Sequence, residues 1–372
     1  MKKKVLFTAS IAKHLLRFHL PYLEWFKDHG YEVHIACDGD EEVPFTDKKW
    51  TVPFVRSPFS SGHFKAFKTL KEIIDQEQYT IIHCHTPMAS IVTRLAGKEA
   101  RYNGTKVLYT AHGFHFFKGS PIINWLTYYP VEILTSGYAD AIITINSEDF
   151  ELIKAKGNSK TKYFLIPGIG VDSEKFFPVS VGVKNQLRAA IGFTNDDFLA
   201  VYAAEFIDRK NHRFIIEALA FAKDKFPKLK VLFCGRGELK EGMEALVKKY
   251  NLESTIIFMG FRNDVDQLYK IADIGISSSK QEGLGLNLVE EMMCGLPILA
   301  TVDRGHKEIV YPGENGFLFE QENKQEFLKY LNLVYSDIDT RKIMRQKSIK
   351  MADKFEISNS LAEMSSIYKK FL

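Results

Sequence analysis

Short apolar runs rich in β-branched residues recur along the whole chain, and a segment with helical spacing of apolar residues follows most of them. The runs are apolar throughout rather than alternating, which is typical of parallel strands covered on both faces. Six runs come first, and after an interruption the series begins again. The strand candidates are 4–10, 32–37, 80–85, 106–111, 141–146, 163–167, 198–206, 230–235, 255–260, 274–279, 298–302 and 316–320. This pattern predicts an α/β protein with two doubly wound, Rossmann-like domains.

The domain boundary is predicted at 167–178, PGIGVDSEKFFP, because Pro, Gly and acidic residues there interrupt both periodicities. The first domain is expected over 1–170 and the second over 171–355. A last helix, 356–372, is expected to pack back across the joint. Ligands of open parallel sheets lie at the carboxyl ends of the strands, so two such domains facing each other would enclose a central cleft.

Charge and cysteine content narrow the class of protein. The formal net charge of 372 residues is only +4, which gives no global field for nucleic acid. Residues 48–118 nevertheless hold eleven Lys or Arg against four Asp or Glu, so this segment could face an anionic surface. The four cysteines have no metal-ligand spacing and lie in or beside apolar runs, so they are expected to be reduced core thiols of a cytoplasmic protein.

The N-terminal stretch MKKKVLFTAS places lysines before an apolar run, as a signal peptide does. The run is broken at Lys13 and has no small-residue cleavage site, so a buried first strand is the better interpretation. Eighteen apolar residues never follow one another, so no transmembrane helix is expected. With the basic segment, this predicts peripheral attachment to the inner face of the cell membrane.

The most informative stretch is SSSKQEGLGLNLVEEMMCGLPILAT, residues 277–301. A strand is expected at its start, and the helical spacing that follows ends at Gly295. Glu282 is therefore expected in the strand-to-helix turn, and Glu290 one to two turns into the helix. A carboxylate accepts two hydroxyl hydrogen bonds, which suits a sugar on one side and a ribose on the other. An ordinary capped helix with solvated glutamates is the alternative.

The turn in this stretch has the residues of a phosphate-binding site. Gly283 and Gly285 would let the backbone approach a ligand closely. The amides near Leu286 and Asn287, at the positive end of the helix, would favour a diphosphate.

EGLGLNLVEEMMCGLPILAT resembles the signature of the family 4 retaining glycosyltransferases, which have the two-domain GT-B fold. The resemblance covers nearly the whole chain. Similar strings stand at matching places in capsule and exopolysaccharide transferases of the CapM and EpsD kind, namely YTAHGFHFF, NHRFIIEALA, GRGELKE, FRNDV, RGHKEIV and ENGFLFE.

The resemblance implies a role for several residues. Glu282 would contact hydroxyls of the donor sugar, Glu290 would bind the ribose, and amides after Gly285 would hold the diphosphate. His112, at the carboxyl end of a first-domain strand, matches a histidine that the family places beside the donor sugar. A packed or surface histidine is the alternative.

AAEFIDRKNH, after the first strand of the second domain, is the next phosphate candidate. Lys210 matches the lysine of the family's Arg-then-Lys clamp, whereas Glu205 stands where the family carries the arginine. Arg209 is therefore a possible second cation, and Glu205 could orient Lys210. A solvated basic turn is the alternative. Arg236 and Arg262, in CGRGE and FRND, resemble loops that surround the base.

Three Asp-x-Asp strings, at 38–40, 264–266 and 337–339, have the pattern of the metal site found in glycosyltransferases of a different fold from GT-B. The first lies in an acidic loop and the others lie on or beside predicted helices, without a supporting strand-end carboxylate. No catalytic metal and no cofactor are therefore expected. Lys210, Arg209 and the helix dipole would stabilise the leaving diphosphate instead.

The first domain is expected to bind the acceptor. Its first loop, TASIAKHLLRFHLP, lacks the glycine-rich form common in the family. Lys13, His14 and Arg17 of this loop could bind a lipid diphosphate. A solvated helix face is an equally good interpretation of these residues.

Residues 56–75 interleave aromatic and basic side chains, which suits attachment to anionic lipid. The helical spacing of the aromatics is also that of a core face. The residues concerned are Phe59, Phe64 and Phe67 with Lys65, Lys68 and Lys71.

The sequence thus predicts a retaining glycosyltransferase of exopolysaccharide or capsule biosynthesis. It would move a hexose or N-acetylhexosamine from a UDP-sugar to an acceptor linked to undecaprenyl diphosphate. A UDP-sugar 2-epimerase of the same architecture would need a cleft rich in carboxylates and histidines, and no lipid-facing surface. A non-catalytic nucleotide-sugar-binding regulator would lack one of Glu282, Glu290 and Lys210, and all three are present.

Overall fold

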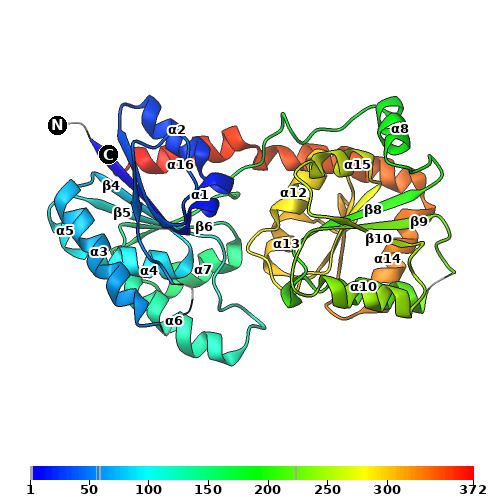
Figure 1. Ribbon diagram of the computed structural model, residues 1–372, viewed down its shortest axis with the longest axis horizontal. Helices are drawn as coiled ribbons and strands as arrows, with labels where there is room; N and C mark the ends of the chain where they lie inside the picture. Colours follow the sequence, from blue (N-terminus) through cyan, green and yellow to red (C-terminus); the bar gives the residue numbers. More distant parts are fainter. Residues whose placement is uncertain (1–2, 56, 58–59, 223) are drawn as a thin grey trace. The chain divides into compact units, whose positions relative to one another are not determined.

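The chain divides into two compact units, each with one parallel sheet covered by helices on both faces (Figure 1). Unit 1 is Met1–Gly170 with Ile357–Leu372, and unit 2 is Val171–Glu356. The prediction of two doubly wound α/β domains is confirmed. The computed structural model describes residues 3–55, 57, 60–222 and 224–372.

The sheet of unit 1 has seven strands in the order β3-β2-β1-β4-β5-β6-β7. The order reverses between β1 and β4, which are parallel neighbours, so their carboxyl ends form a topological switch point. The strands are β1 (Lys4–Ile11), β2 (Glu32–Asp38), β3 (Lys48–Thr51), β4 (Ile81–His85), β5 (Lys106–Ala111), β6 (Ala141–Thr144) and β7 (Lys162–Leu165).

Helices α1, α2 and α16 cover one face of this sheet, and α3, α4 and α6 cover the other (Figure 1). α16 packs against α2, so the C-terminal helix belongs to unit 1. The helices of the unit are α1 (Ala12–Phe18), α2 (Leu20–Asp28), α3 (Gly62–Glu77), α4 (Pro87–Ala96), α5 (Lys98–Tyr102), α6 (Ile122–Ser136), α7 (Ser147–Lys156) and α16 (Ile357–Lys369).

The sheet of unit 2 has six strands in the order β10-β9-β8-β11-β12-β13, and it reverses between β8 and β11. The carboxyl ends of β8 and β11 therefore lie side by side. The strands are β8 (Phe198–Ala203), β9 (Leu229–Cys234), β10 (Ile256–Gly260), β11 (Ile274–Ser277), β12 (Ile298–Thr301) and β13 (Gly316–Phe319).

Most helices of unit 2 follow a strand and return the chain to the next parallel strand. They are α8 (Val181–Ala190), η1 (Asp208–Lys210), α9 (His212–Phe221), α10 (Lys240–Lys249), α11 (Val265–Ile271), α12 (Leu286–Met293), α13 (Arg304–Ile309), α14 (Lys324–Ser336), α15 (Ile338–Ala352) and η2 (Asp353–Phe355). The core between sheet and helices is rich in phenylalanine and β-branched residues.

A buried ion pair fixes α6 against α4. Arg94 of α4 donates from Nη1 and Nη2 to the two carboxylate oxygens of Glu132 on α6, over 2.7 and 3.2 Å. Both side chains are almost fully buried. Because a guanidinium and a carboxylate bind in one planar arrangement, this pair sets which face of α6 points outward.

Two observations concern the state of the cysteines and the suitability of the helices for crossing a membrane. The four cysteines are buried and free. In the part of the chain that the structure describes, none of the helices is both long and apolar enough to cross a membrane.

Candidate active site

Two loops at the carboxyl ends of β8 and β11 bring a carboxylate and two cations together. Glu282, in the loop before α12, is buried. Its Oε1 accepts from Nζ of Lys210, and its Oε2 accepts from Nη1 of Arg209 over 3.1 Å. Nη1 of Arg209 also donates to the carbonyl oxygen of Gln281 over 2.8 Å. Three of the charged residues predicted for the site therefore form one cluster.

The charges within this cluster decide the protonation state of Glu282. Burial alone would raise the pKa of its carboxyl group, but the positive charges of Lys210 and Arg209 outweigh burial and lower the pKa to about 2. The group is ionised at neutral pH. An ammonium has three N–H donors, so Lys210 can bond Glu282 and still offer donors to phosphate oxygens.

Three consecutive serines and a tyrosine join the two loops. The hydroxyl of Tyr202 donates to the carbonyl oxygen of Lys210 over 2.6 Å and lies 3.0 Å from the hydroxyl of Ser279. Ser278 donates to the carbonyl oxygen of Asn211 over 2.9 Å. These bonds fix the backbone that carries Lys210. Sequence reasoning missed this role of the serines, although the run of three small hydroxyl residues at a strand end was a visible signal.

The predicted glycine turn is present at the start of α12. Gly285 precedes the helix with a φ of +99°, a conformation that suits glycine. No side chain among the described residues caps α12 at this position. Leu286 and Asn287 form its first turn and are half-buried, so the positive end of the helix lies in the same loop as Glu282.

Two adjacent glutamates on α12 have different environments. Glu290 is half-buried, and burial of Tyr269 and the negative charge of Glu290 are among the causes that raise the pKa of Tyr269. Glu291 is fully buried, and burial raises its pKa well above the usual value. A Cβ atom on Gly275 of β11 would lie only 1.9 Å from Oε2 of Glu291. Glu291 is therefore part of the core, and Glu290 is the carboxylate that a ligand can reach.

The prediction that Glu205 orients Lys210 is wrong, because Lys210 pairs with Glu282. Glu205 is exposed on the loop after β8. That loop also packs against the GRG segment after β9, since a Cβ on Gly237 would lie 2.5 Å from the carbonyl oxygen of Phe206.

The two arginines predicted near the base have different partners. The guanidinium of Arg236 lies over the ring of Phe261, 4.8 Å from its centroid, and Phe261 is exposed. Arg262 forms a two-bond pair with Asp264. Arg236 and Phe261 thus offer a flat surface for stacking, whereas Arg262 is already paired.

Two residues that sequence reasoning missed lie behind the Glu282 loop. Asp303 accepts from the amide of Gly305 over 2.8 Å and so caps α13. His306 is fully buried, and its Nδ1 lies 2.8 Å from the carbonyl oxygen of Thr301. A Cβ on Gly305 would lie 2.8 Å from the amide of Leu284, so α13 approaches the turn closely.

Two of the three Asp-x-Asp strings, 264–266 and 337–339, have structural roles within the described residues. Asp264 pairs with Arg262, and Asp266 pairs with Lys270 over 2.9 Å. Asp337 caps α15 by accepting from two backbone amides.

A pocket of about 410 Å³ lies beside η1. It contains none of the predicted site residues and does not mark the site. Its lining includes Phe206, Asp208, Asn211, Arg213, Glu217 and Lys280.

His112 lies in unit 1, directly after β5. Its Nε2 is 3.4 Å from Nδ1 of His85, and its ring packs edge-on against that of His14. Of the other first-loop candidates, Lys13 pairs with Glu41 over 3.3 Å, and Arg17 lies over the ring of Phe18.

The predicted membrane segment is partly described. Phe64 is exposed and Phe67 is half-buried against the core of unit 1. Lys65 and Lys68 are exposed, whereas Lys71 pairs with two carboxylates of unit 1. Phe59 lies outside the described residues.

Two family models match the chain. The model described as "Glycosyl transferases group 1" matches residues 183–351, and the model described as "Glycosyl transferase 4-like" matches residues 4–146. The matches cover most of unit 2 and most of unit 1, respectively.

Curated relatives and solved structures agree with these models. The chain is 42% identical to "Putative glycosyltransferase EpsD" of Bacillus subtilis (strain 168), over 100% of this chain and 98% of the relative. It is 25% identical to "UDP-Gal:alpha-D-GlcNAc-diphosphoundecaprenol alpha-1,3-galactosyltransferase" of Escherichia coli, over 95% and 92%. The solved structure of Anabaena Alr3699/HepE in complex with UDP and glucose superposes with a TM-score of 0.79 at 20% identity, over 99% and 100% of the two chains, which shows a shared fold.

Proposed function

Because the chain belongs to the group 1 glycosyltransferases, we propose that it transfers a hexose or N-acetylhexosamine from a UDP-sugar to a lipid-linked glycan acceptor with retention of configuration. The observation that carries the proposal is the cluster of Glu282, Lys210 and Arg209 beside the glycine turn of α12. This arrangement places cations, a helix N-terminus and a hydroxyl-binding carboxylate within one loop region of unit 2.

The substrate classes in this proposal are taken from the names of relatives and solved structures. The Escherichia coli relative is named for a UDP-galactose donor and a diphosphoundecaprenol acceptor, and HepE has been solved with UDP-glucose. The Bacillus subtilis relative carries the name EpsD, which hints at exopolysaccharide. In this chain, unit 2 would bind the donor and unit 1 the acceptor.

The proposed reaction breaks the bond between the anomeric carbon and the UDP oxygen. Charge grows on the diphosphate, where Lys210, Arg209 and the positive end of α12 stabilise it. The acceptor oxygen bonds to the anomeric carbon on the same face, and its proton passes to the departing phosphate oxygen. Glu282 positions the sugar hydroxyls, and Glu290 binds the ribose.

The purified chain should release UDP from a UDP-sugar only when a membrane lipid extract is present, and it should do so in excess EDTA. EDTA tests metal independence, because the cations and helix end of the site take the place of Mg²⁺ or Mn²⁺. UDP release and sugar isomerisation are followed together by chromatography. Isomerisation without UDP release supports the epimerase, UDP binding with neither reaction supports a regulator, and activity restored by Mg²⁺ or Mn²⁺ contradicts metal independence.

Glu290→Ala should weaken the binding of UDP itself by about 1–3 kcal/mol, the cost of losing hydrogen bonds to a charged acceptor. Glu282→Gln should weaken UDP binding less than Glu290→Ala does and should lower turnover, since Glu282 positions the sugar hydroxyls and also bonds Lys210 and Arg209. Titration calorimetry with UDP measures the first effect and initial rates measure the second. The roles are refuted if Glu282→Gln weakens UDP more than Glu290→Ala does.

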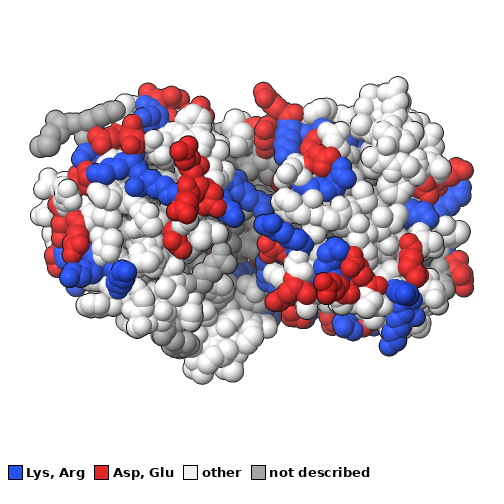
Figure 2. Space-filling model, in the orientation of Figure 1, with Lys and Arg blue, Asp and Glu red and all other residues white. Residues whose placement is uncertain are grey.

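We also propose that α6 is the membrane contact of unit 1. Its large apolar side chains form an outward stripe at intervals of four and eight positions, and the most exposed are Ile122 (74%), Leu126 (68%) and Leu134 (74%). Glu132 is the one charged residue of the helix, and it is buried with Arg94. Figure 2 shows uncharged side chains along the edge of unit 1 where Figure 1 places α6.

The lysines of α3 complete this surface, because α3 and α6 both pack against α4. Each basic residue near an anionic bilayer contributes about 1 kcal/mol, and inserting a Leu or Ile side chain fully contributes roughly 1.5–3 kcal/mol. Lys65 and Lys68 are exposed and can act in this way. Lys71 is paired and should contribute little.

Ile122→Ser/Leu126→Ser/Leu134→Ser should abolish flotation of the chain with anionic liposomes, and Lys65→Glu/Lys68→Glu should weaken it and remove its dependence on salt. Ile338→Ser/Ile343→Ser on α15 of unit 2, where both isoleucines are 56% exposed, is the matched apolar control and should float normally. Lys71→Gln is the control for the paired lysine. Equal flotation of the α6 triple variant and the unchanged chain would exclude α6 as the membrane contact.

A further inference from the structure

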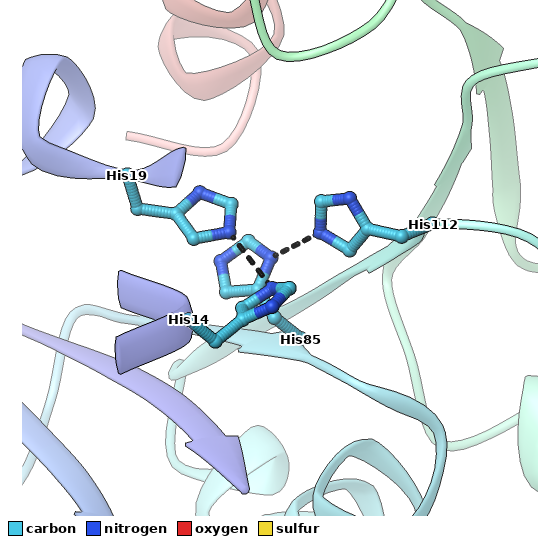
Figure 3. Close-up of side chains that lie close together, drawn as sticks. All are labelled: His14, His19, His85 and His112. Carbon is cyan, nitrogen blue, oxygen red and sulfur yellow. Dashed lines mark hydrogen bonds between the residues drawn. The ribbon is translucent and has the colours of Figure 1, made fainter. Parts of the chain in front are cut away.

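Four histidine rings meet at the carboxyl end of the sheet of unit 1 (Figure 3). His85 is the last residue of β4, His112 follows β5, His14 lies on α1, and His19 lies at the joint between α1 and α2. One ring nitrogen of each residue lies within 4.8 Å of the other three. Four separate segments thus point their imidazoles at one place, at the switch point between β1 and β4.

The separations between the nitrogens match those of metal ligands. Nε2 of His19 is 3.3 Å from Nε2 of His14, and Nε2 of His112 is 3.4 Å from Nδ1 of His85. Two nitrogens bound to tetrahedral zinc at about 2.0–2.1 Å lie about 3.3–3.4 Å apart. These two pairs therefore have the spacing of nitrogens on one tetrahedral ion, and all four ligand nitrogens lie within 4.8 Å of one another.

The rings are available as ligands at neutral pH. Burial lowers the pKa of His14 to about 4 and holds the pKa values of His19, His85 and His112 well below the usual value. A neutral imidazole keeps one nitrogen lone pair for a metal.

We propose that His14, His19, His85 and His112 bind one transition-metal ion of the zinc class. Four imidazoles suit Zn²⁺ and its neighbours rather than Mg²⁺ or Ca²⁺, which prefer oxygen ligands. His14 and His112 are only half-buried, so an ion can reach the site from their side. A bound ion would tie α1 and the α1–α2 joint to the ends of β4 and β5. Its charge, met only by neutral ligands, would attract an anionic group.

The four histidines belong to unit 1. Glu282, Lys210 and Arg209 belong to unit 2, so the inference does not rest on the proposed transferase activity. It does compete with the placement of His112 beside the donor sugar, because a metal would occupy its Nε2. Metal content therefore decides which role His112 has, and UDP release decides the function separately.

The test uses the full-length chain without a histidine tag, freed of metal by dialysis against a chelator and then given Zn²⁺ alone. We expect one Zn²⁺ per chain after gel filtration and a rise in the unfolding temperature on zinc addition. In His14→Gln and His85→Gln, zinc binding should weaken by more than the roughly 10- to 100-fold that loss of an outer-shell partner costs.

His83→Gln is the matched control. His83 is buried on the same strand as His85, but its two nitrogens bond the hydroxyls of Tyr368 and Thr110, both at 2.8 Å. The His83→Gln variant should therefore keep one Zn²⁺ per chain. If the ligand variants do not fold, Co²⁺ added to the unchanged chain gives the answer. An intense visible spectrum of a tetrahedral nitrogen site supports the proposal, and an absent or weak octahedral spectrum overturns it, as does undiminished zinc in the ligand variants.

Discussion

Lys210→Ala should lower the turnover of the enzyme by about 10²- to 10³-fold, the usual cost of removing one preorganised group that stabilises transition-state charge. Lys210 is held by Glu282 on one side and by the bonded backbone of its own loop on the other. Its ammonium therefore needs no reorganisation when charge develops on the leaving diphosphate. Initial rates of UDP release at saturating donor measure the effect.

Two variants separate this role from a general loss of charge. Lys210→Arg keeps the cation and should recover part of the rate. Lys280→Ala removes a lysine of the neighbouring loop that pairs with the exposed Asp208, and it should change turnover by less than about threefold, since exposed pairs contribute at most about 1 kcal/mol. Turnover of Lys210→Ala close to that of Lys280→Ala would show that Lys210 has no special role.

The fold was predictable because its strands are buried on both faces. All residues of β4 and nearly all of β1 are buried, so continuous apolar runs identify them. β3, with the sequence KKWT, was missed. It is an edge strand whose residues are exposed or half-buried, and only its pairing with β2 makes it a strand. Such tertiary pairing leaves no periodic signal in four residues.

Candidate site residues could be proposed from the sequence, but the contacts between them could not. The glycine turn and its two glutamates are local features, and Lys210 follows a recognisable strand. The pairing of Lys210 with Glu282 joins residues 72 positions apart, and it depends on β8 and β11 being neighbours. For the same reason Tyr269, which contacts Glu290, had no local signal.

The outward stripe of α6 shows a different limit of sequence reasoning. Apolar residues at helical spacings normally indicate a core face, and Ile122, Leu126 and Leu134 follow one another at intervals of four and eight positions. They are nevertheless exposed, because another face of α6 packs Trp125, Tyr129 and Ile133 against the core of unit 1 and carries Glu132, which bonds Arg94, 38 positions earlier. The sequence alone could not reveal which apolar face would be buried or which residue Glu132 would pair with.

Glu132→Ala should destabilise unit 1 by about 3–5 kcal/mol, because it leaves the guanidinium of Arg94 buried without its counter-charge. Arg94 is fully buried, and its remaining contacts are the ring of Tyr109 at 4.5 Å and bonds to Ser90. None of these supplies a negative charge. Hydrogen exchange at the amides of β4 and β5 measures the effect, since a chain of two units need not unfold in one step.

The double variant Arg94→Met/Glu132→Leu is the decisive comparison, because replacing both partners of a buried pair by apolar residues is often neutral or stabilising. It should therefore protect β4 and β5 better than Glu132→Ala does. Lys71→Ala, which breaks the more exposed pair with Glu99, should cost less than about 1 kcal/mol. If Glu132→Ala matches Lys71→Ala, the buried pair does not hold α6 in place. If protection is lost as expected, α6 is free to turn its apolar stripe inward, and flotation with anionic liposomes should weaken in the same variant.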